Sequence, residues 1–114
     1  ARSDKGEVVA RFRASLFERM TSGEWSEEEI ARDLHMSRRS LQRRLAEADA
    51  SYQSLVDDTR RDMALRYIRD PAKSATDITF LLGYSQQSVF TRAFRRWTGM
   101  SPSEFRSRKS LASA

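Results

Sequence analysis

The sequence predicts an all-α fold of about seven helices, divided into two small lobes that a long linker helix joins. Apolar residues recur at spacings of three and four, which is the period of a helix with one buried face. Only 4 Gly and 2 Pro interrupt the 114 residues. One short pattern of apolar and polar positions also occurs twice along the chain. A chain of this length forms one domain or two very small lobes rather than two full domains.

The first helix is predicted from about residue 4 to residue 22. Gly23 follows it, and glycine is a common residue just beyond the end of a helix. The stripe expected to be buried consists of five apolar residues at helical spacing: Val8, Val9, Phe12, Leu16 and Met20.

Two shorter helices are predicted next. Ser26 and Glu29 have the spacing of a capping box, in which a hydroxyl and a carboxylate satisfy free backbone N–H groups, so a helix is expected to about residue 34. His35 and Met36 form a turn, after which Ser37 caps a third helix that ends near residue 48.

The linker is a longer helix capped by Ser51. It is expected to end at about residue 69, because Pro71 cannot continue it. Its apolar residues spread over more than one side, which is typical of a helix that packs against two neighbours.

The second lobe is predicted to begin with a short helix that starts at Thr76 and Asp77 and is closed by Gly83. Ser85 is expected to cap the next helix, which runs to about residue 98 and is closed by Gly99. The core residues expected here are Ile78, Phe80, Leu81, Leu82, Val89, Phe90, Ala93, Phe94 and Trp97.

A last helix is predicted after Ser101, with Pro102 at its first position and Glu104 at its third. A disordered tail is expected after Arg108. The predicted organisation is a first lobe over residues 4–50, a linker helix over 51–70, a second lobe over 71–108 and a tail over 109–114.

An internal repeat relates the two lobes. The repeated positions are Ile30, Leu34, Ser37 and Ser40, which recur at an offset of 48 as Ile78, Leu82, Ser85 and Ser88. A second set, Leu41, Arg43 and Leu45, recurs at an offset of 49 as Phe90, Arg92 and Phe94. Each copy is a short helix, a turn and a second capped helix, which is the helix-turn-helix layout. A linker helix of about 27 Å would suit two second helices on adjacent major-groove turns of a duplex, about 34 Å apart.

The composition favours a nucleic-acid partner. Lys+Arg is 21 against Asp+Glu 16, a net charge of +5, and 18 of the basic residues are arginine. Arginine's planar guanidinium fits phosphates and base edges better than lysine's ammonium does. The chain has no cysteine and a single histidine, His35, so thiol catalysis and a zinc site are not expected.

Other classes are excluded on similar grounds. No apolar run approaches the length of a membrane span, and the N-terminus lacks the apolar segment of a signal peptide. No convergent set of acid, base and nucleophile indicates an enzyme, and no cofactor motif is present. The chain does not begin with Met, so we expect a piece of a longer protein. The expected location is the cytoplasm, with association with the nucleoid when the protein is bound to DNA.

The residues in the second lobe resemble the DNA-binding domain of the AraC/XylS-type transcriptional regulators. Residues 75–106 follow, nearly position for position, the family signature I-A-x-x-x-G-(F/Y)-x-x-x-S-x-F-x-R-x-F-(K/R)-x-x-x-G-x-(S/T)-P-x-x-(F/Y)-R. Residues 30–60 match more loosely but in order, and the resemblance covers roughly residues 8 to 108. Thr79 and Asp49 are departures, since the family usually has alanine at the first and often glycine near the second.

The resemblance implies two helix-turn-helix lobes joined by a rigid helix, and a role in the activation or repression of transcription. It also implies a separate sensing or dimerisation domain that this chain lacks.

Base contacts are expected from the first two turns of each second helix. In the first lobe the candidates are Arg38, Arg39, Gln42 and Arg43. Arginine can bind guanine O6 and N7, and glutamine can bind adenine N6 and N7, each for about 1–3 kcal/mol of discrimination. The alternatives are a solvated charged face and, for Arg43, an ion pair with Glu47 four residues on.

The corresponding candidates in the second lobe are Gln86, Gln87, Ser88, Thr91 and Arg92. They carry less charge, so this lobe is expected to bind DNA more weakly than the first. Arg92 lies between Phe90 and Phe94, which leaves a structural role as its alternative.

Phosphate contacts are expected where helix N-termini and basic side chains meet the DNA backbone. The candidates at helix caps are Ser37, Ser85 and Ser101, for which capping alone is the alternative. The candidates with charged side chains are Arg44, Arg95, Arg96, Arg106 and Arg108.

The leading hypothesis is a sequence-specific domain that binds double-stranded DNA through one recognition helix from each lobe. A helical module that contacts the transcription machinery is the alternative, and a non-specific or RNA-binding domain is a third. The acidic segment over residues 24–33 could meet RNA polymerase or could be a solvated face.

Overall fold

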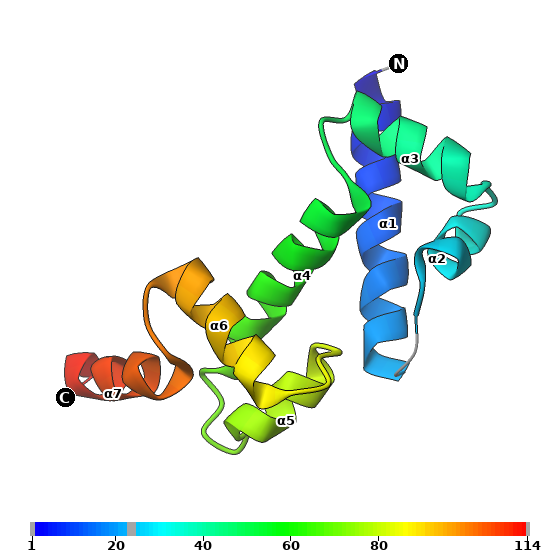
Figure 1. Cartoon of the computed structure of the whole chain (residues 1–114). Coiled ribbons are helices and arrows are strands. Elements are labelled where there is room, and N and C mark those ends of the chain that lie inside the picture. The colour runs from blue at the N-terminus through cyan, green and yellow to red at the C-terminus, as the bar shows by residue number, and fades with distance from the viewer. Residues whose placement is uncertain (1, 23–24, 114) are drawn as a thin grey trace. The chain divides into compact units, whose positions relative to one another are not determined.

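The computed structural model describes residues 2–22 and 25–113, with the side chains of residues 6–22 and 25–108. The described residues form helices and no strands, which confirms the predicted all-α fold. The seven helices among them are α1 (Arg2–Ser22), α2 (Glu27–Asp33), α3 (Arg38–Glu47), α4 (Tyr52–Tyr67), α5 (Ala75–Leu81), α6 (Gln87–Thr98) and α7 (Pro102–Ser113) (Figure 1). None of the helices in the described part of the chain is long and apolar enough to cross a membrane.

The chain divides into two compact units, Ala1–Thr59 and Arg60–Ala114, and the division falls inside α4. In the first unit α1 packs against α2 and α3, which also contact each other (Figure 1). Its core consists of side chains that are almost fully buried: Val8, Phe12, Leu16, Met20, Ile30, Leu34, Leu41 and Leu45. Val9 is half-buried rather than part of this core, and Gly23, the predicted cap of α1, lies outside the described residues.

The two helix starts predicted in the first unit are confirmed. The Ser26 hydroxyl accepts the Glu29 backbone N–H over 3.2 Å, and the Ser37 hydroxyl accepts the Ser40 N–H over 3.1 Å. The turn after α2 places His35 at φ 59°, and the turn after α3 places Asp49 at φ 56°. Both residues therefore adopt the left-handed conformation that glycine tolerates best. At Asp49, where the family often has glycine, the turn thus keeps the left-handed backbone although the residue is not glycine.

The linker helix α4 starts as predicted. Ser51 and Ser54 each accept the other's backbone N–H, over 3.1 and 3.0 Å. The helix ends at Tyr67, a little before the predicted residue 69, because hydrogen bonds of the turn type replace the helical ones up to Asp70.

In the second unit α6 packs against α5 and α7. Its core is aromatic, since the Phe94 ring meets those of Phe90 and Phe105 edge-on, with ring centres 5.7 and 5.4 Å apart. Ile78 and Leu82 are also fully buried, as predicted.

Two predicted helix starts in this unit are wrong. The cap of α5 is Ser74, which forms a capping box with Asp77, so Thr76 lies inside the helix. The cap of α6 is Gln86 in an extended conformation without a side-chain cap bond, so Ser85 lies just outside the helix. The prediction missed the Ser74–Asp77 spacing, which is the same signal that located α2.

The core prediction fails at Phe80, whose side chain is 66% exposed. Phe80 follows the buried Ile78 by two positions and so lies on the opposite side of the helix. Leu81, which was also predicted to be in the core, is only half-buried.

The last helix forms as predicted at its start. Gly99 closes α6 at φ 80°, and Ser101 and Glu104 complete a reciprocal capping box over 3.2 and 3.1 Å. The predicted disordered tail is wrong for residues 109–113, because α7 continues to Ser113. The stretch after Arg108 contains neither glycine nor proline to stop the helix.

Candidate nucleic-acid interface

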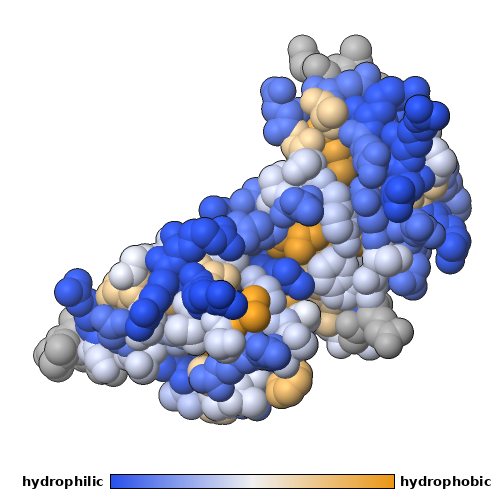
Figure 2. Space-filling model, in the orientation of Figure 1, coloured by the Kyte–Doolittle hydropathy of each residue, from blue (hydrophilic) through white to orange (hydrophobic). Residues whose placement is uncertain are grey.

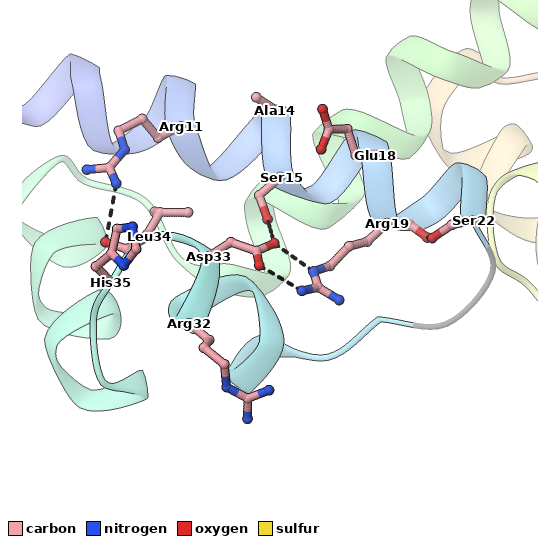
Figure 3. A pocket seen from close by; sticks show the side chains of 10 residues that line it. All are labelled: Arg11, Ala14, Ser15, Glu18, Arg19, Ser22, Arg32, Asp33, Leu34 and His35. Carbon is pink, nitrogen blue, oxygen red and sulfur yellow. Dashed lines mark hydrogen bonds and ion pairs between the residues drawn. The ribbon is translucent and has the colours of Figure 1, made fainter.

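In the first unit, side chains of α1 hold the end of α2. Arg19 donates to both carboxylate oxygens of Asp33 over 2.8 and 2.7 Å, and the Ser15 hydroxyl donates to the same carboxylate over 2.7 Å (Figure 3). These bonds, first from Arg19 and then from Ser15, lower the pKa of Asp33 to about 2. Arg11 also donates to the carbonyl oxygen of Leu34, over 3.2 Å, at the start of the turn into α3. The geometry of the helix-turn-helix is thus fixed from α1.

The helix α3 is buried along one side only. Leu41 and Leu45 are fully buried, whereas the four side chains predicted to contact bases are all exposed: Arg38, Arg39, Gln42 and Arg43. The surface over α3 in Figure 2 is accordingly almost entirely hydrophilic. Arg39 and Arg43 are four positions apart, so they share a face of the helix. Among the described residues neither makes a hydrogen bond or an ion pair, and the predicted alternative of an Arg43–Glu47 pair does not form.

The other two candidates contact acidic residues at the start of α2. The Gln42 amide donates to the Glu27 carboxylate over 3.1 Å. Arg38 Nη1 lies 3.5 Å from Glu28 Oε1, with both side chains more than half exposed. Exposed pairs of this kind contribute about 0.2–1 kcal/mol to stability. The acidic start of α2 is therefore an immediate neighbour of the exposed face of α3, which the sequence did not indicate.

In the second unit, Gln86, Gln87, Ser88 and Arg92 are exposed and Thr91 is half-buried. Arg92 stands between the fully buried Phe90 and Phe94, yet it faces outward and its side chain forms no bond with the described residues. The structural alternative for Arg92 is thus not favoured. Gln87 accepts a hydrogen bond at Oε1 from the Thr76 hydroxyl of α5, over 3.0 Å.

The cap residues predicted to contact phosphate have different surroundings. Ser37 is exposed at the start of α3, and its hydroxyl serves as the cap. Ser85 is exposed but does not cap α6, which corrects the prediction made for it. Ser101 is buried, and its hydroxyl is occupied by the Glu104 N–H.

The charged candidates also differ in their surroundings. Arg44, Arg95, Arg96 and Arg108 are exposed. Arg95 lies 3.9 Å from a Glu104 carboxylate oxygen, and the Arg96 guanidinium lies 5.7 Å from the centre of the Trp97 ring.

Arg106, which was predicted to contact phosphate, forms hydrogen bonds within its own unit. Its guanidinium donates to the carbonyl oxygens of Ile68 over 3.0 Å, of Asp70 over 3.1 Å and of Lys73. These bonds tie α7 to the end of α4 and leave the side chain half-buried, so Arg106 has a structural role that the prediction of a phosphate contact did not anticipate. A guanidinium can donate to several carbonyl groups at once, so an arginine can join two backbone segments in addition to contacting phosphate.

Comparison with known proteins agrees with this geometry. Residues 30–108 match the family model described as a helix-turn-helix domain. The ornithine utilization regulator of Pseudomonas aeruginosa is 44% identical over 79 residues, which are 69% of this chain and 23% of that protein. The HTH-type transcriptional regulator VirS of Mycobacterium tuberculosis is 42% identical over 87 residues, which are 76% of this chain and 26% of that protein. The chain thus spans about a quarter of the length of these relatives.

Solved structures share the fold. The crystal structure of a DNA-binding transcriptional dual regulator from Escherichia coli K-12 matches with a TM-score of 0.83 and 29% identity, covering 91% of this chain and 93% of that one. The DNA-binding domain of AdpA, a global transcriptional factor solved in complex with a target DNA, matches with a TM-score of 0.73 and 25% identity, covering 96% and 95%.

The fold and the exposed polar helices define a domain with two helix-turn-helix units. The relatives that share it are transcriptional regulators rather than enzymes. This chain belongs to the AraC-type helix-turn-helix family.

Proposed function

We propose that the chain binds double-stranded DNA in a sequence-specific manner, with α3 and α6 each entering a major-groove segment. The observation that carries the proposal is the polar face of α3, on which Arg39 and Arg43 are exposed opposite the fully buried Leu41 and Leu45. A face with free guanidinium groups on a rigidly seated helix suits the acceptor pairs of guanine. The AdpA domain, of similar fold, was solved with its target DNA, which supports the proposal. It concerns DNA binding alone, since the chain spans about a quarter of its curated relatives.

The experiment is selection of bound duplexes from a random library at about 0.15 M salt, where long-range electrostatic binding is partly screened. Two enriched sequence boxes about ten base pairs apart would support the entry of both helices. A single box would restrict recognition to one unit. Binding that vanishes as salt rises, with no enriched sequence, would contradict the proposal and favour a non-specific nucleic-acid partner.

A module that contacts other proteins through the acidic start of α2 is less well supported. Glu27 and Glu28 contact Gln42 and Arg38, and Glu29 pairs with Arg19 over 2.7 Å. These carboxylates therefore have partners within their own unit, rather than forming an unpaired acidic face.

A further inference from the structure

One contact recurs between the two helices of each helix-turn-helix. Glu28 is the second residue of α2, and its carboxylate lies 3.5 Å from Nη1 of Arg38, the first residue of α3. Thr76 is the second residue of α5, and its hydroxyl donates over 3.0 Å to Oε1 of Gln87, the first residue of α6. The same two helix positions are thus joined in both units, although the residue types differ completely.

In the second unit this contact fixes the orientation of an amide. The Thr76 hydroxyl donates to the Gln87 carbonyl oxygen, so both N–H groups of the amide nitrogen stay available to another partner, together with the second lone pair of the oxygen. An oriented amide nitrogen is a donor, and the matching major-groove acceptors are purine N7, guanine O6 and thymine O4. The two-bond pairing with adenine N6 and N7 needs the carbonyl oxygen as well.

In the first unit the contact leaves further donors on the same side chain. A guanidinium carries five N–H groups, and Glu28 engages Nη1 of Arg38. The remaining groups can donate to two acceptors of a guanine edge while the carboxylate holds the other side. A side chain held in this way loses less conformational freedom when it meets a base.

We propose that Thr76 and Glu28 are positioning residues that determine the base specificity of Gln87 and Arg38. Thr76 makes Gln87 a donor to a base-pair acceptor, and Glu28 presents the free N–H groups of Arg38 to a guanine. The proposal rests on the proposed DNA-binding function. It adds which kind of base-edge group each unit recognises at one base pair. Both pairs lie on the surface and add little to folding stability, so their removal leaves the fold intact.

The experiment compares duplex selection by the wild-type chain with selection by variants. Gln87→Ala marks the base pair at which Gln87 acts. Thr76→Val, which replaces the hydroxyl with a methyl group, should relax the preference at that same pair by roughly three- to tenfold, the value of one hydrogen bond. Thr76→Ser, which keeps the hydroxyl, should retain the preference. Thr21→Val is the matched control, because the Thr21 hydroxyl donates within α1 to the Glu18 carbonyl.

The Glu28 variants separate orientation from charge. Glu28→Ala and Glu28→Gln both remove a negative charge, so both should raise affinity for all duplexes to a similar extent. Only Glu28→Ala should also relax the preference at the pair read by Arg38. The Glu28→Gln variant keeps a side-chain carbonyl oxygen at the same position, and that oxygen can still accept from Arg38.

Failure of the inference is distinguishable from failure of the proposed function. A wild-type chain that enriches no sequence would overturn both. Enriched boxes that are identical for wild type and Thr76→Val, or a Thr76→Val effect that persists when added to Gln87→Ala, would overturn the inference for Thr76 alone. Equal changes in preference for Glu28→Ala and Glu28→Gln would overturn it for Glu28.

Discussion

Arg60 of α4 donates from Nε to the carbonyl oxygen of Leu82 over 2.8 Å, at the point where α5 ends and the turn to α6 begins. Its guanidinium also lies 4.2 Å from the centre of the Tyr84 ring. In the first unit Arg11 of α1 donates to the carbonyl oxygen of Leu34, which is the corresponding position after α2. Each helix-turn-helix is therefore held at its turn by an arginine from the long helix that precedes it.

Removing the arginine at the second turn should loosen the second unit. We expect Arg60→Met, which keeps the apolar stem, to lower the free energy of unfolding by about 1–2 kcal/mol through loss of the charged hydrogen bond and the ring contact. Arg66→Met is the control, because Arg66 is an exposed arginine of the same helix whose side chain forms no bond with the described residues. Thermal denaturation of both variants measures the difference. Equal effects would show that the Leu82 bond carries no stability of its own.

The two turns also share a left-handed residue, which is Gly83 in the second unit at φ 81° and His35 in the first at φ 59°. A residue with a β-carbon is strained there by about 1–2 kcal/mol, and the greater freedom of glycine in the unfolded chain offsets part of the gain from relieving that strain. We expect His35→Gly to raise the free energy of unfolding by about 0.5 kcal/mol and Gly83→Ala to lower it by about 1 kcal/mol. Denaturant titration tests both. A destabilised His35→Gly would mean that the imidazole contributes contacts that outweigh the strain.

Much of the fold follows from local signals in the sequence. The stripe of α1 and the serines at the starts of α2, α3, α4 and α7 depend on residues close together in the chain, so the sequence alone locates them. The prediction for Ser85 is wrong because Ser85 stands two residues before the first residue of α6, and the extended residue that directly precedes the helix is Gln86.

The site was predictable in part. Exposure of Arg39, Arg43 and Arg92 follows from the burial of their neighbours two positions away. The contacts Glu28–Arg38 and Thr76–Gln87 depend on how two helices cross, which no local pattern encodes. Arg106 misled for a related reason, since its three carbonyl acceptors lie 33–38 residues earlier in the chain.

The structural role of Arg106 can be separated from a role in DNA binding. We expect Arg106→Ala to lower the free energy of unfolding by about 2 kcal/mol, because three backbone carbonyl groups lose a charged donor. The exposed Arg108 is the control, and Arg108→Ala should change stability by less than about 0.5 kcal/mol. Denaturant titration of the two variants measures this difference.

The same two variants differ in their dependence on salt. Loss of a phosphate contact reduces the slope of log affinity against log salt by about 0.9. We expect this reduction for Arg108→Ala and an unchanged slope for the folded fraction of Arg106→Ala. A stable Arg106→Ala variant with a reduced slope of log affinity against log salt would show that Arg106 contacts phosphate.

The ion pair at the end of α2 should make the first unit sensitive to acid. The pKa of Asp33 in the folded protein is about 2, which is below the ordinary value near 4 in the unfolded chain. The ion pair therefore stabilises the fold above about pH 4 and ceases to do so as the pH falls toward 2. Because the carboxylate is 39% exposed, solvent screening limits the contribution to about 1 kcal/mol.

This contribution is measured by comparing wild type with Asp33→Asn from pH 7 to pH 2. The wild type should be the more stable protein at pH 7, and the difference should shrink as the wild-type carboxylate becomes protonated. Glu47→Gln is the control, because Glu47 is an exposed residue of the same unit whose carboxylate forms no bond with the described residues. A difference for Asp33→Asn that stays constant with pH would assign it to packing rather than to charge.

Substitution of Arg39 gives the most specific test of the proposed function. It is exposed, makes no bond to the described residues and shares a face with Arg43. We expect Arg39→Ala to lose about 1–3 kcal/mol of discrimination at one or two base pairs, with other positions of the binding site unchanged. Arg32→Ala is the matched control, because Arg32 is an exposed arginine of α2 that lines the groove between α1 and α2 rather than the face of α3 (Figure 3). Selection from a random duplex library compares the two. A uniform loss of affinity over all sequences would make Arg39 a phosphate contact, and an unchanged binding site would exclude Arg39 from base recognition.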